Sequence, residues 1–484
     1  MKRKERPTLL KEASTPGRRG YLPPVSDVPP VPAGELIPQS FLRQTALALP
    51  ELSEMEVTRH FNSLAQRSFG VDQGFYPLGS CTMKYNPKVL EELSQLPGFQ
   101  GLHPLQEETT VQGALALLHY AEEVFSTITG MDEFTLQPAA GAHGELTGLL
   151  IIKAALLEQG ETDRDTILIP DSAHGTNPAS AALVGFKVQT VPTSPAGIIE
   201  PETLKPYLNS NVAGLMLTNP NTLGLFEEKI LTITKMIHDI GGQVYCDGAN
   251  LNAILGWARP GDMGFDLIHL NLHKTFATPH GGGGPGAGPV GVKKHLAKYL
   301  PIPRVVSTPE GWHWQYDLPH SIGKIKGYWG HFGVIIKALA YILQLGYAGL
   351  KQVSSDAVLA ANYLQTLLKE VYHLPYDTPC MHEFVLSGLR DEQSKINTLD
   401  LAKGLIDFGV HPPTIYFPLI VPEAMMIEPT EAVTLELLNS FVTIMKELAR
   451  LAKEEPEALK TAPRTTPVRR LNEAQAARHP ILKW

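Results

Sequence analysis

A lysine and an aspartate, each at the end of an apolar run, are the residues whose types and spacing most clearly suggest chemistry. Lys274 follows the run Leu267–Asn271, and Asp247 follows the run Gln243–Cys246. A lysine that is desolvated, or that lies near other cations, has a lowered pKa and can form an imine. A carboxylate can keep a pyridine nitrogen protonated, which makes the ring a better electron sink. The two residues together predict a pyridoxal phosphate site and carbanion chemistry next to an amine.

Each of these residues also has an ordinary interpretation. Most lysines after a strand are solvated surface charges, and an aspartate at a strand end often caps a helix or a turn. The surroundings favour the cofactor interpretation. The glycine-rich run Gly281–Gly286 allows close backbone approach beside Lys274, and Ala249 is small enough to let a ring lie against the backbone.

Two further segments could complete such a site. Ala140, Gly141 and Ala142 come just before an apolar helix, and small residues at a helix N-terminus leave backbone amides free to bind a phosphate. His174 follows the apolar run Thr166–Pro170, so it could stack on the cofactor ring or move a proton, or be a plain loop histidine. We therefore expect Lys274, Asp247 and His174 to be catalytic. The cofactor-binding set adds the small residues and the neighbour of the lysine: Ala140, Gly141, Ala142, Ala249 and Thr275.

The glycine run raises a second possibility, a dinucleotide site. Gly281–Gly286 fits the pattern G-x-G-x-x-G, but it precedes the strand-like segment Pro289–Val292. The dinucleotide fingerprint needs a strand before it and a helix after it, so we reject this interpretation. A phosphate-binding P-loop fails as well, because the lysine that it requires does not follow.

The elements around these residues predict an α/β fold. Short apolar runs bounded by turn residues alternate with helical windows, which is typical of a mostly parallel sheet covered on both faces. Ligands gather at the carboxyl ends of the strands in such sheets. The expected strands are Thr166–Pro170, Phe186–Val191, Gly214–Thr218, Gln243–Cys246, Leu267–Asn271 and Val290–Val292. The expected helices of this region are Val111–Ile128, Glu145–Gln159 and Glu227–Ile240.

Changes in composition divide the chain into four parts. We expect an extended N-terminal arm and entry segment (1–108), a large cofactor-binding domain (109–345), a smaller C-terminal α/β domain (346–460) and a polar tail (461–484). In the small domain, Leu350–Val371 and Thr434–Glu455 should be helices that flank strands at Glu383–Leu386 and Thr414–Ile420. The Pro- and Gly-rich arm is either a disordered tail or a segment that packs on a partner subunit.

Composition excludes several classes of protein. The chain has 484 residues, 43% of them hydrophobic, and a net charge of -8, which argues against a nucleic-acid surface. Its three cysteines have no CxxC spacing, so we expect no disulfide framework, no metal site and a cytoplasmic location. The apolar windows 146–158 and 332–350 are interrupted by Lys153 and Lys337, and we expect neither to span a membrane.

These residues also match a known family. The chain resembles the P-proteins of the glycine cleavage system, the glycine decarboxylases, over nearly its whole length. The sequences Pro-Leu-Gly-Ser-Cys-Thr-Met-Lys and Asn-Leu-His-Lys-Thr are highly specific to that family. The matching segments are Pro16–Gly20, Pro77–Pro87, Gln137–Gly148, Ala173–Ser180, Asp247–Asn252, His269–Thr275, Gly281–Gly291 and Met426–Glu431.

The resemblance implies a fold, an activity and partners. The fold would be fold type I of the pyridoxal phosphate enzymes, with Lys274 forming the imine, Asp247 facing the pyridine nitrogen, His174 stacking on the ring and Ala140–Ala142 holding the phosphate. The activity would be that of an aminomethyl-transferring glycine dehydrogenase, which releases carbon dioxide and passes the aminomethyl group to the lipoyl arm of the carrier H-protein.

The resemblance covers only the second of the two homologous halves that long family members carry. It therefore implies a cofactor-bearing subunit 2 with a separate subunit 1, in a heterotetramer of two copies each. Two alternatives stay open: another amino-acid decarboxylase or an aminotransferase, and a non-catalytic scaffold that kept the fold. A scaffold has no need of Lys274.

Overall fold

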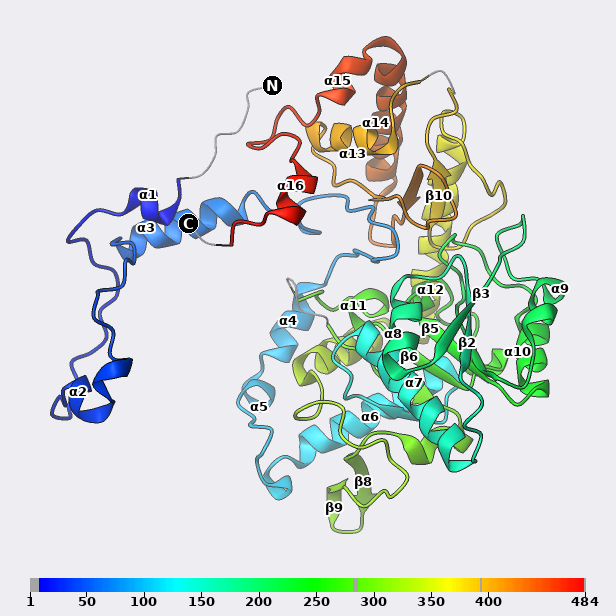
Figure 1. Cartoon of the computed structure of the whole chain (residues 1–484), viewed down its shortest axis with the longest axis horizontal. Coiled ribbons are helices and arrows are strands. Elements are labelled where there is room, and N and C mark those ends of the chain that lie inside the picture. The colour runs from blue at the N-terminus through cyan, green and yellow to red at the C-terminus, as the bar shows by residue number, and fades with distance from the viewer. Residues whose placement is uncertain (1–7, 282–285, 392–393, 483–484) are drawn as a thin grey trace. The chain divides into compact units, whose positions relative to one another are not determined.

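A seven-stranded sheet is packed between helices in the larger part of the chain (Figure 1). Its strand order is β1-β7-β6-β5-β4-β2-β3, and the strands from β6 to β3 run parallel, whereas β7 is antiparallel to both of its neighbours. The expected mostly parallel sheet is therefore confirmed. The strands are β1 (Glu133–Thr135), β2 (Thr166–Pro170), β3 (Lys187–Val191), β4 (Val212–Thr218), β5 (Gln243–Gly248), β6 (Leu267–Leu270) and β7 (Val290–Val292).

The structure is a computed structural model, and it describes residues 8–281, 286–391 and 394–482. The described chain divides into two units, one formed by residues 74–462 and the other by the N-terminal residues up to 73 together with those from 463 onwards. Residues 282–285 of the glycine run that we expected beside Lys274 lie outside the described part of the chain.

Helices cover both faces of the sheet because successive strand residues point to opposite sides. One face packs against α7 (Gly141–Glu158) and α8 (Thr176–Val184). The other packs against α6 (Gln112–Thr129), α10 (Ile230–Asp239) and the first part of α12 (Phe332–Leu368). The expected helices of this region are thus confirmed, with ends shifted by a few residues.

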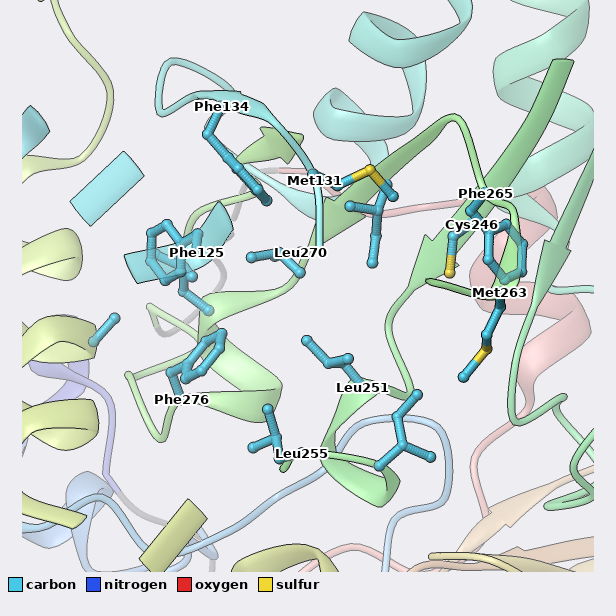
Figure 2. Close-up of a cluster of buried hydrophobic side chains, with 14 of the residues drawn as sticks. Phe125, Met131, Phe134, Cys246, Leu251, Leu255, Met263, Phe265, Leu270 and Phe276 are labelled. Atoms are coloured by element: carbon cyan, nitrogen blue, oxygen red, sulfur yellow. The ribbon is translucent and has the colours of Figure 1, made fainter. Parts of the chain in front are cut away.

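The core on the α6 side anchors the segment that carries Lys274. Figure 2 shows Phe125 of α6 close to Phe134 and Phe276. The Phe125 ring centroid lies 5.8 Å from that of Phe134 and 5.6 Å from that of Phe276, in tilted arrangements that aromatic rings favour. Phe276 is fully buried two residues after Lys274, so this packing fixes the end of the short helix α11 (Leu272–Thr275).

Helix α12 connects two hydrophobic cores of this unit. It extends beyond the apolar window 332–350 and, by length and composition alone, is long enough to cross a membrane, contrary to our expectation for that window. Gly346 interrupts it with a φ of 60°, which divides it into two helical segments. Ile335, Leu339 and their neighbours join the core around the sheet, whereas Leu364 and Leu368 join the second core.

The second core belongs to a small three-stranded antiparallel sheet with order β10-β12-β11. The expected strand Thr414–Ile420 is shorter than predicted. It ends after Ile415, because Tyr416 has a left-handed φ of 57° and Pro418 has no amide hydrogen for a sheet. The elements here are β10 (Phe384–Ser387), β11 (Thr414–Ile415), β12 (Ala424–Ile427), α13 (Thr398–Asp407), α14 (Leu435–Glu454) and α15 (Pro456–Lys460).

The remaining elements of residues 74–462 are short. A two-stranded hairpin, β8 (Arg304–Thr308) and β9 (Gly311–Gln315), follows the large sheet. The short helices are α4 (Lys88–Ser94), α5 (Pro97–Gln100), η2 (Glu108–Thr110), α9 (Pro201–Leu204), η3 (Lys205–Tyr207), η4 (Leu251–Ala253), η5 (Pro260–Met263) and η6 (Lys294–Tyr299).

The unit formed by the residues up to 73 and from 463 onwards, here called the terminal unit, consists mainly of irregular chain and short helices, in keeping with its many prolines. Its longest element is α3, where Ser53 and Glu56 form a capping box at the N-terminus. Tyr21 and Phe41 are 78% and 79% exposed. The helices of this unit are α1 (Leu10–Ala13), α2 (Ala33–Leu36), η1 (Gln39–Phe41), α3 (Glu54–Ala65) and α16 (Glu473–Arg478).

Candidate active site

A cavity of about 260 Å³ lies where the parallel strands β4, β5 and β6 end. This is the edge at which an α/β sheet of this kind binds ligands. All the predicted catalytic and cofactor-binding residues except Thr275 line it: Ala140, Gly141, Ala142, His174, Asp247, Ala249 and Lys274.

Thr275 lies behind the cavity. Its side chain is fully buried, and its carbonyl oxygen accepts a hydrogen bond from Lys84 Nζ at 3.1 Å. Lys274 and Thr275 are neighbours in the single turn α11, so their side chains leave the helix in different directions. Thr275 thus contributes to the packing that supports Lys274.

Asp247 is held as a carboxylate at the end of β5. Asn177 Nδ2 donates to its Oδ2 at 2.9 Å, and the amide of Ala249 donates to its Oδ1 at 3.0 Å. Burial alone would raise its pKa, but His269, the hydrogen bonds and the charge of Lys274 together hold that pKa well below its usual range. Because a carboxylate has about four acceptor positions, Asp247 keeps one for a further donor in the cavity.

His269 on β6 is the partner that keeps Asp247 ionised. Its Nε2 lies 3.1 Å from Asp247 Oδ1, and both side chains are at least 96% buried. Its Nδ1 lies 3.1 Å from the hydroxyl of Tyr245, which donates its own proton to the Gly144 carbonyl at 3.0 Å. Nδ1 therefore faces the Tyr245 oxygen, and Nε2 faces the Asp247 carboxylate, with Asn271 Nδ2 3.3 Å away. Burial lowers the pKa of His269, but Asp247 outweighs burial and the net pKa is raised.

The N-terminus of α7 supplies a site for an anion. Ala140 has extended backbone and caps the helix without a side-chain hydrogen bond. The first amides of a helix have no carbonyl partner within it, and the helix dipole favours negative charge there. A Cβ at Gly141 would lie 2.1 Å from Asn271 Oδ1, so any larger residue here would displace Asn271 or the helix end.

His174 lies at the cavity in a fixed orientation. Its Nδ1 is 3.0 Å from the hydroxyl of Thr176, which also bonds to Glu145 Oε1 at 2.8 Å. Burial, followed by the charge of Lys274, lowers the pKa of His174, so the ring is neutral at neutral pH. A neutral, anchored imidazole presents a flat face to a ligand and can also accept a proton.

Several residues of this site were missed by the sequence analysis. His269 and Tyr245 lie within apolar strands, where single polar residues are the only signal, and Asn177 lies inside an apolar helix. Ser80 reaches the cavity from a segment almost two hundred residues before Lys274. His273 also lines the cavity, and burial lowers its pKa to about 3.

Three separate features of the cavity match what pyridoxal phosphate requires of its binding site. A lysine opens into the cavity, an ionised carboxylate with a spare acceptor position faces it, and a helix N-terminus free of side-chain capping adjoins it. The cofactor needs an amine, a partner for its ring nitrogen and a phosphate site. The same geometry suits reactions that form a carbanion next to an amine, which this cofactor stabilises.

Two family models match the chain. The first, described as "Glycine cleavage system P-protein", matches residues 32–311. The second, "Glycine dehydrogenase, C-terminal domain", matches residues 353–468. A relative from Caldanaerobacter subterraneus, named "Probable glycine dehydrogenase (decarboxylating) subunit 2", is 56% identical over 481 residues, which is 99% of each chain. A relative of the same name from Alkaliphilus oremlandii is 55% identical over 98% of each chain.

Solved structures share the fold. A crystal structure of glycine decarboxylase (P-protein) of the glycine cleavage system in inhibitor-bound form has a TM-score of 0.72 and 22% identity, covering 86% of this chain and 94% of its own. Glutamate decarboxylase from Lactobacillus brevis has a TM-score of 0.64 and 13% identity, covering 87% and 97%. These likenesses confirm the expected fold, fold type I of the pyridoxal phosphate enzymes.

Proposed function

The chain belongs to the glycine cleavage system P-protein family, and we propose that it works there as the pyridoxal phosphate-bearing subunit of a glycine decarboxylase. In this reaction glycine loses carbon dioxide, and its aminomethyl group passes to the lipoyl arm of a carrier H-protein. The observation that carries the proposal is the cavity in which Lys274 and the ionised Asp247 meet at the N-terminus of α7. The names of the full-length relatives support the same activity.

Each part of the cofactor would have a partner in the cavity. Lys274 would hold it covalently, Asp247 would face the ring nitrogen, and the amides at Ala140–Ala142 would bind the phosphate. His174 would lie against the ring. When bound, pyridoxal phosphate supplies a conjugated ring that takes up the electron pair left on glycine Cα as carbon dioxide departs.

The protein residues hold charges and protons in place for this chemistry. Asp247 stays ionised because His269 is paired with it, so it can keep a proton on a ring nitrogen. His269 is in turn fixed by Tyr245, whose hydroxyl is tied to the backbone of α7. This chain of contacts is buried, so no rearrangement of water accompanies the charge shift that the reaction requires.

The proposal includes partners and a location. The relatives are named subunit 2, which supports a separate subunit 1, and we propose a heterotetramer with two copies of each. The exposed Tyr21 and Phe41 of the terminal unit support an arm that packs on a partner subunit. A cytoplasmic location fits the three free cysteines, Cys81, Cys246 and Cys380.

Product analysis tests the proposed function. The purified chain, subunit 1, pyridoxal phosphate and lipoylated carrier are incubated with glycine labelled in its carboxyl group. We expect labelled carbon dioxide whose release depends on the lipoyl acceptor. Keto acid formation would instead identify an aminotransferase, and release that does not need the carrier would identify another type of decarboxylase. No turnover and no bound cofactor would favour a scaffold.

A further inference from the structure

A strap formed by residues 78–86 connects the small sheet to the segment that carries Lys274. At one end, Leu78 bridges Ile427 of β12, and the amide of Gly79 donates to the Met426 carbonyl at 3.3 Å. A Cβ at Gly79 would lie 2.2 Å from Met426 Cγ, so the contact requires glycine. The strap thus lies directly against the end of β12, the middle strand of the small sheet.

The other end of the strap is tied to the backbone that directly follows Lys274. Lys84 Nζ donates to the carbonyl of Thr275 at 3.1 Å, and Asn86 Nδ2 donates to the carbonyl of Ala277 at 2.8 Å. Between these two ends, Ser80 forms part of the cavity wall. Any movement of the strap therefore moves the wall of the cavity relative to the backbone behind Lys274.

Three glutamates from the C-terminal part of the chain hold alternate residues of the strap. The amide of Ser80 donates to Glu383 Oε2 at 2.8 Å, and the amide of Thr82 donates to Glu428 Oε2 at 2.9 Å. The next alternate residue, Lys84, forms an ion pair with Glu431 at 2.7 Å.

The strap needs such contacts because its backbone is strained. Ser80 and Thr82 have φ values of 63° and 49°, in the left-handed region that residues with a Cβ rarely adopt. Strained conformations of this kind persist when the surrounding structure holds them and are concentrated at functional sites. The hydrogen bonds to Glu383 and Glu428 are made by the amides of these same two residues.

Glu383 and Glu428 can hold these amides in their protonated forms. Both side chains are fully buried, and burial raises the pKa of Glu428 to about 7 and that of Glu383 well above its usual range. A protonated carboxyl still has an acceptor oxygen for a backbone amide. Glutamine has the same shape and the same acceptor, so it should replace either residue with the hydrogen bond kept.

We propose that Glu383 and Glu428 are positioning residues that hold Ser80–Thr82 in place as the wall of the Lys274 cavity. This inference rests on the proposed function, because it assigns the two glutamates to the reaction in that cavity. Neither glutamate lines the cavity, so each acts through the strap.

Alkylation of Cys81 tests the strap without cofactor or substrate. Cys81 lies between the two bonded amides and is partly buried, whereas Cys246 and Cys380 are 1% and 3% exposed and report on unfolding of the rest of the chain. The full chain is treated with N-ethylmaleimide, and labelling of each cysteine is followed by mass spectrometry. We expect Glu383→Ala and Glu428→Ala to speed Cys81 labelling by about 10-fold, with the other two cysteines unchanged.

Two kinds of control variant make the result specific. Glu383→Gln and Glu428→Gln remove the carboxyl but keep the acceptor, and we expect Cys81 to react at nearly the wild-type rate. Glu227 is a matched buried glutamate elsewhere, since it accepts the amide of Ile199 at 2.9 Å and burial raises its pKa to about 7. Glu227→Ala should leave Cys81 unchanged. Equal labelling in wild type and both alanine variants, or an equal effect in Glu227→Ala, would overturn the proposal.

Two further measurements keep the inference separate from the proposed function. In the wild-type chain, the Ser80 and Thr82 amides should exchange slowly with deuterium, and rapid exchange would overturn the proposal even if no variant folds.

In the assembled enzyme, the alanine variants should lose about 10-fold in kcat for glycine and the glutamine variants should recover it. Unchanged kcat in alanine variants with fast Cys81 labelling would overturn the positioning role. A wild type without glycine turnover would instead refute the proposed function.

Discussion

His269 Nε2 lies 3.1 Å from Asp247 Oδ1, and this buried contact determines the charge at the base of the candidate active site. Asp247 lies on β5 and His269 on the neighbouring parallel strand β6, and the two residues are directly opposite each other in the register of these strands. Because the carboxylate is ionised and rigid before any ligand arrives, the cavity has a fixed negative charge next to Lys274. Such preorganised charges are among the largest contributions to enzyme catalysis.

Replacing Asp247 by asparagine should remove that charge and keep the shape of the side chain. We expect kcat for glycine to fall by about 100-fold or more, because a neutral amide does not keep the ring nitrogen protonated. Much of the cofactor should remain bound, since Lys274 and the helix N-terminus are unchanged. Steady-state kinetics and the cofactor content of the purified variant check this. A rate near that of the wild type would show that ring protonation has another source.

The same contact should make stability depend on pH. The pKa of His269 is raised in the folded state, so its contribution is fully present below the unfolded pKa of about 6.5 and is lost as the pH rises through the folded pKa. Asp247 has a lowered pKa, so its contribution is present above about 3.9 and is lost as the pH falls through the folded pKa. We therefore expect the free energy of unfolding to decrease with pH above about 6.5.

Urea unfolding of wild type and His269→Gln across this pH range measures the effect. The variant leaves Asp247 buried without its charged partner and should lose about 3–5 kcal/mol of stability near pH 6. The difference between the two proteins should shrink as the pH rises. A difference that stays constant with pH would mean that His269 is neutral in the folded protein.

Gly141→Ala should damage the anion site at the start of α7. The added Cβ would lie 2.1 Å from Asn271 Oδ1, so the helix end or Asn271 must move. We expect the dissociation constant for pyridoxal phosphate to increase by about 10-fold. Gly175→Ala is the matched control, because a Cβ there meets no atom within 4 Å. Fluorescence titration measures the affinity of both variants for the cofactor. Equal affinities would show that Ala140–Ala142 do not bind its phosphate.

Lys84→Met should destabilise the chain far more than the loss of a surface lysine. Lys84 is 1% exposed and paired with Glu431, so its removal leaves a poorly solvated carboxylate and should cost about 3–5 kcal/mol. The control Lys235→Met breaks a pair with Asp239 in which the side chains are 72% and 59% exposed, worth about 0.5 kcal/mol. Thermal unfolding compares the two variants. Similar melting temperatures would show that the buried pair contributes little.

The local pattern of the sequence was enough to predict the large sheet and the place of the cavity. Except for the largely exposed β3, the strands from β2 to β7 consist mostly of buried apolar residues. The ends of the neighbouring parallel strands bring Asp247 and Lys274 together. Strand β1 was missed because two of its three residues, Glu133 and Thr135, are polar, so it is not an apolar run. It pairs with β7, which lies far along the chain.

The supports of the site could not be predicted in the same way. The contact of Ser80 with Glu383 joins residues 303 apart, and that of Thr82 with Glu428 joins residues 346 apart. No local periodicity encodes such separations. Before the fold is known, a buried glutamate next to a strand looks the same as one on a surface.

The absorption spectrum of the assembled protein tests the central claim most directly. The chain and subunit 1 are reconstituted with pyridoxal phosphate, and spectra are recorded before and after addition of glycine, for wild type and Lys274→Ala. We expect a band from the covalently held cofactor in the wild type, a shift of that band with glycine, and no such band in the variant. A band that does not change when glycine is added would contradict the assigned substrate. An identical band in Lys274→Ala would contradict the assigned lysine.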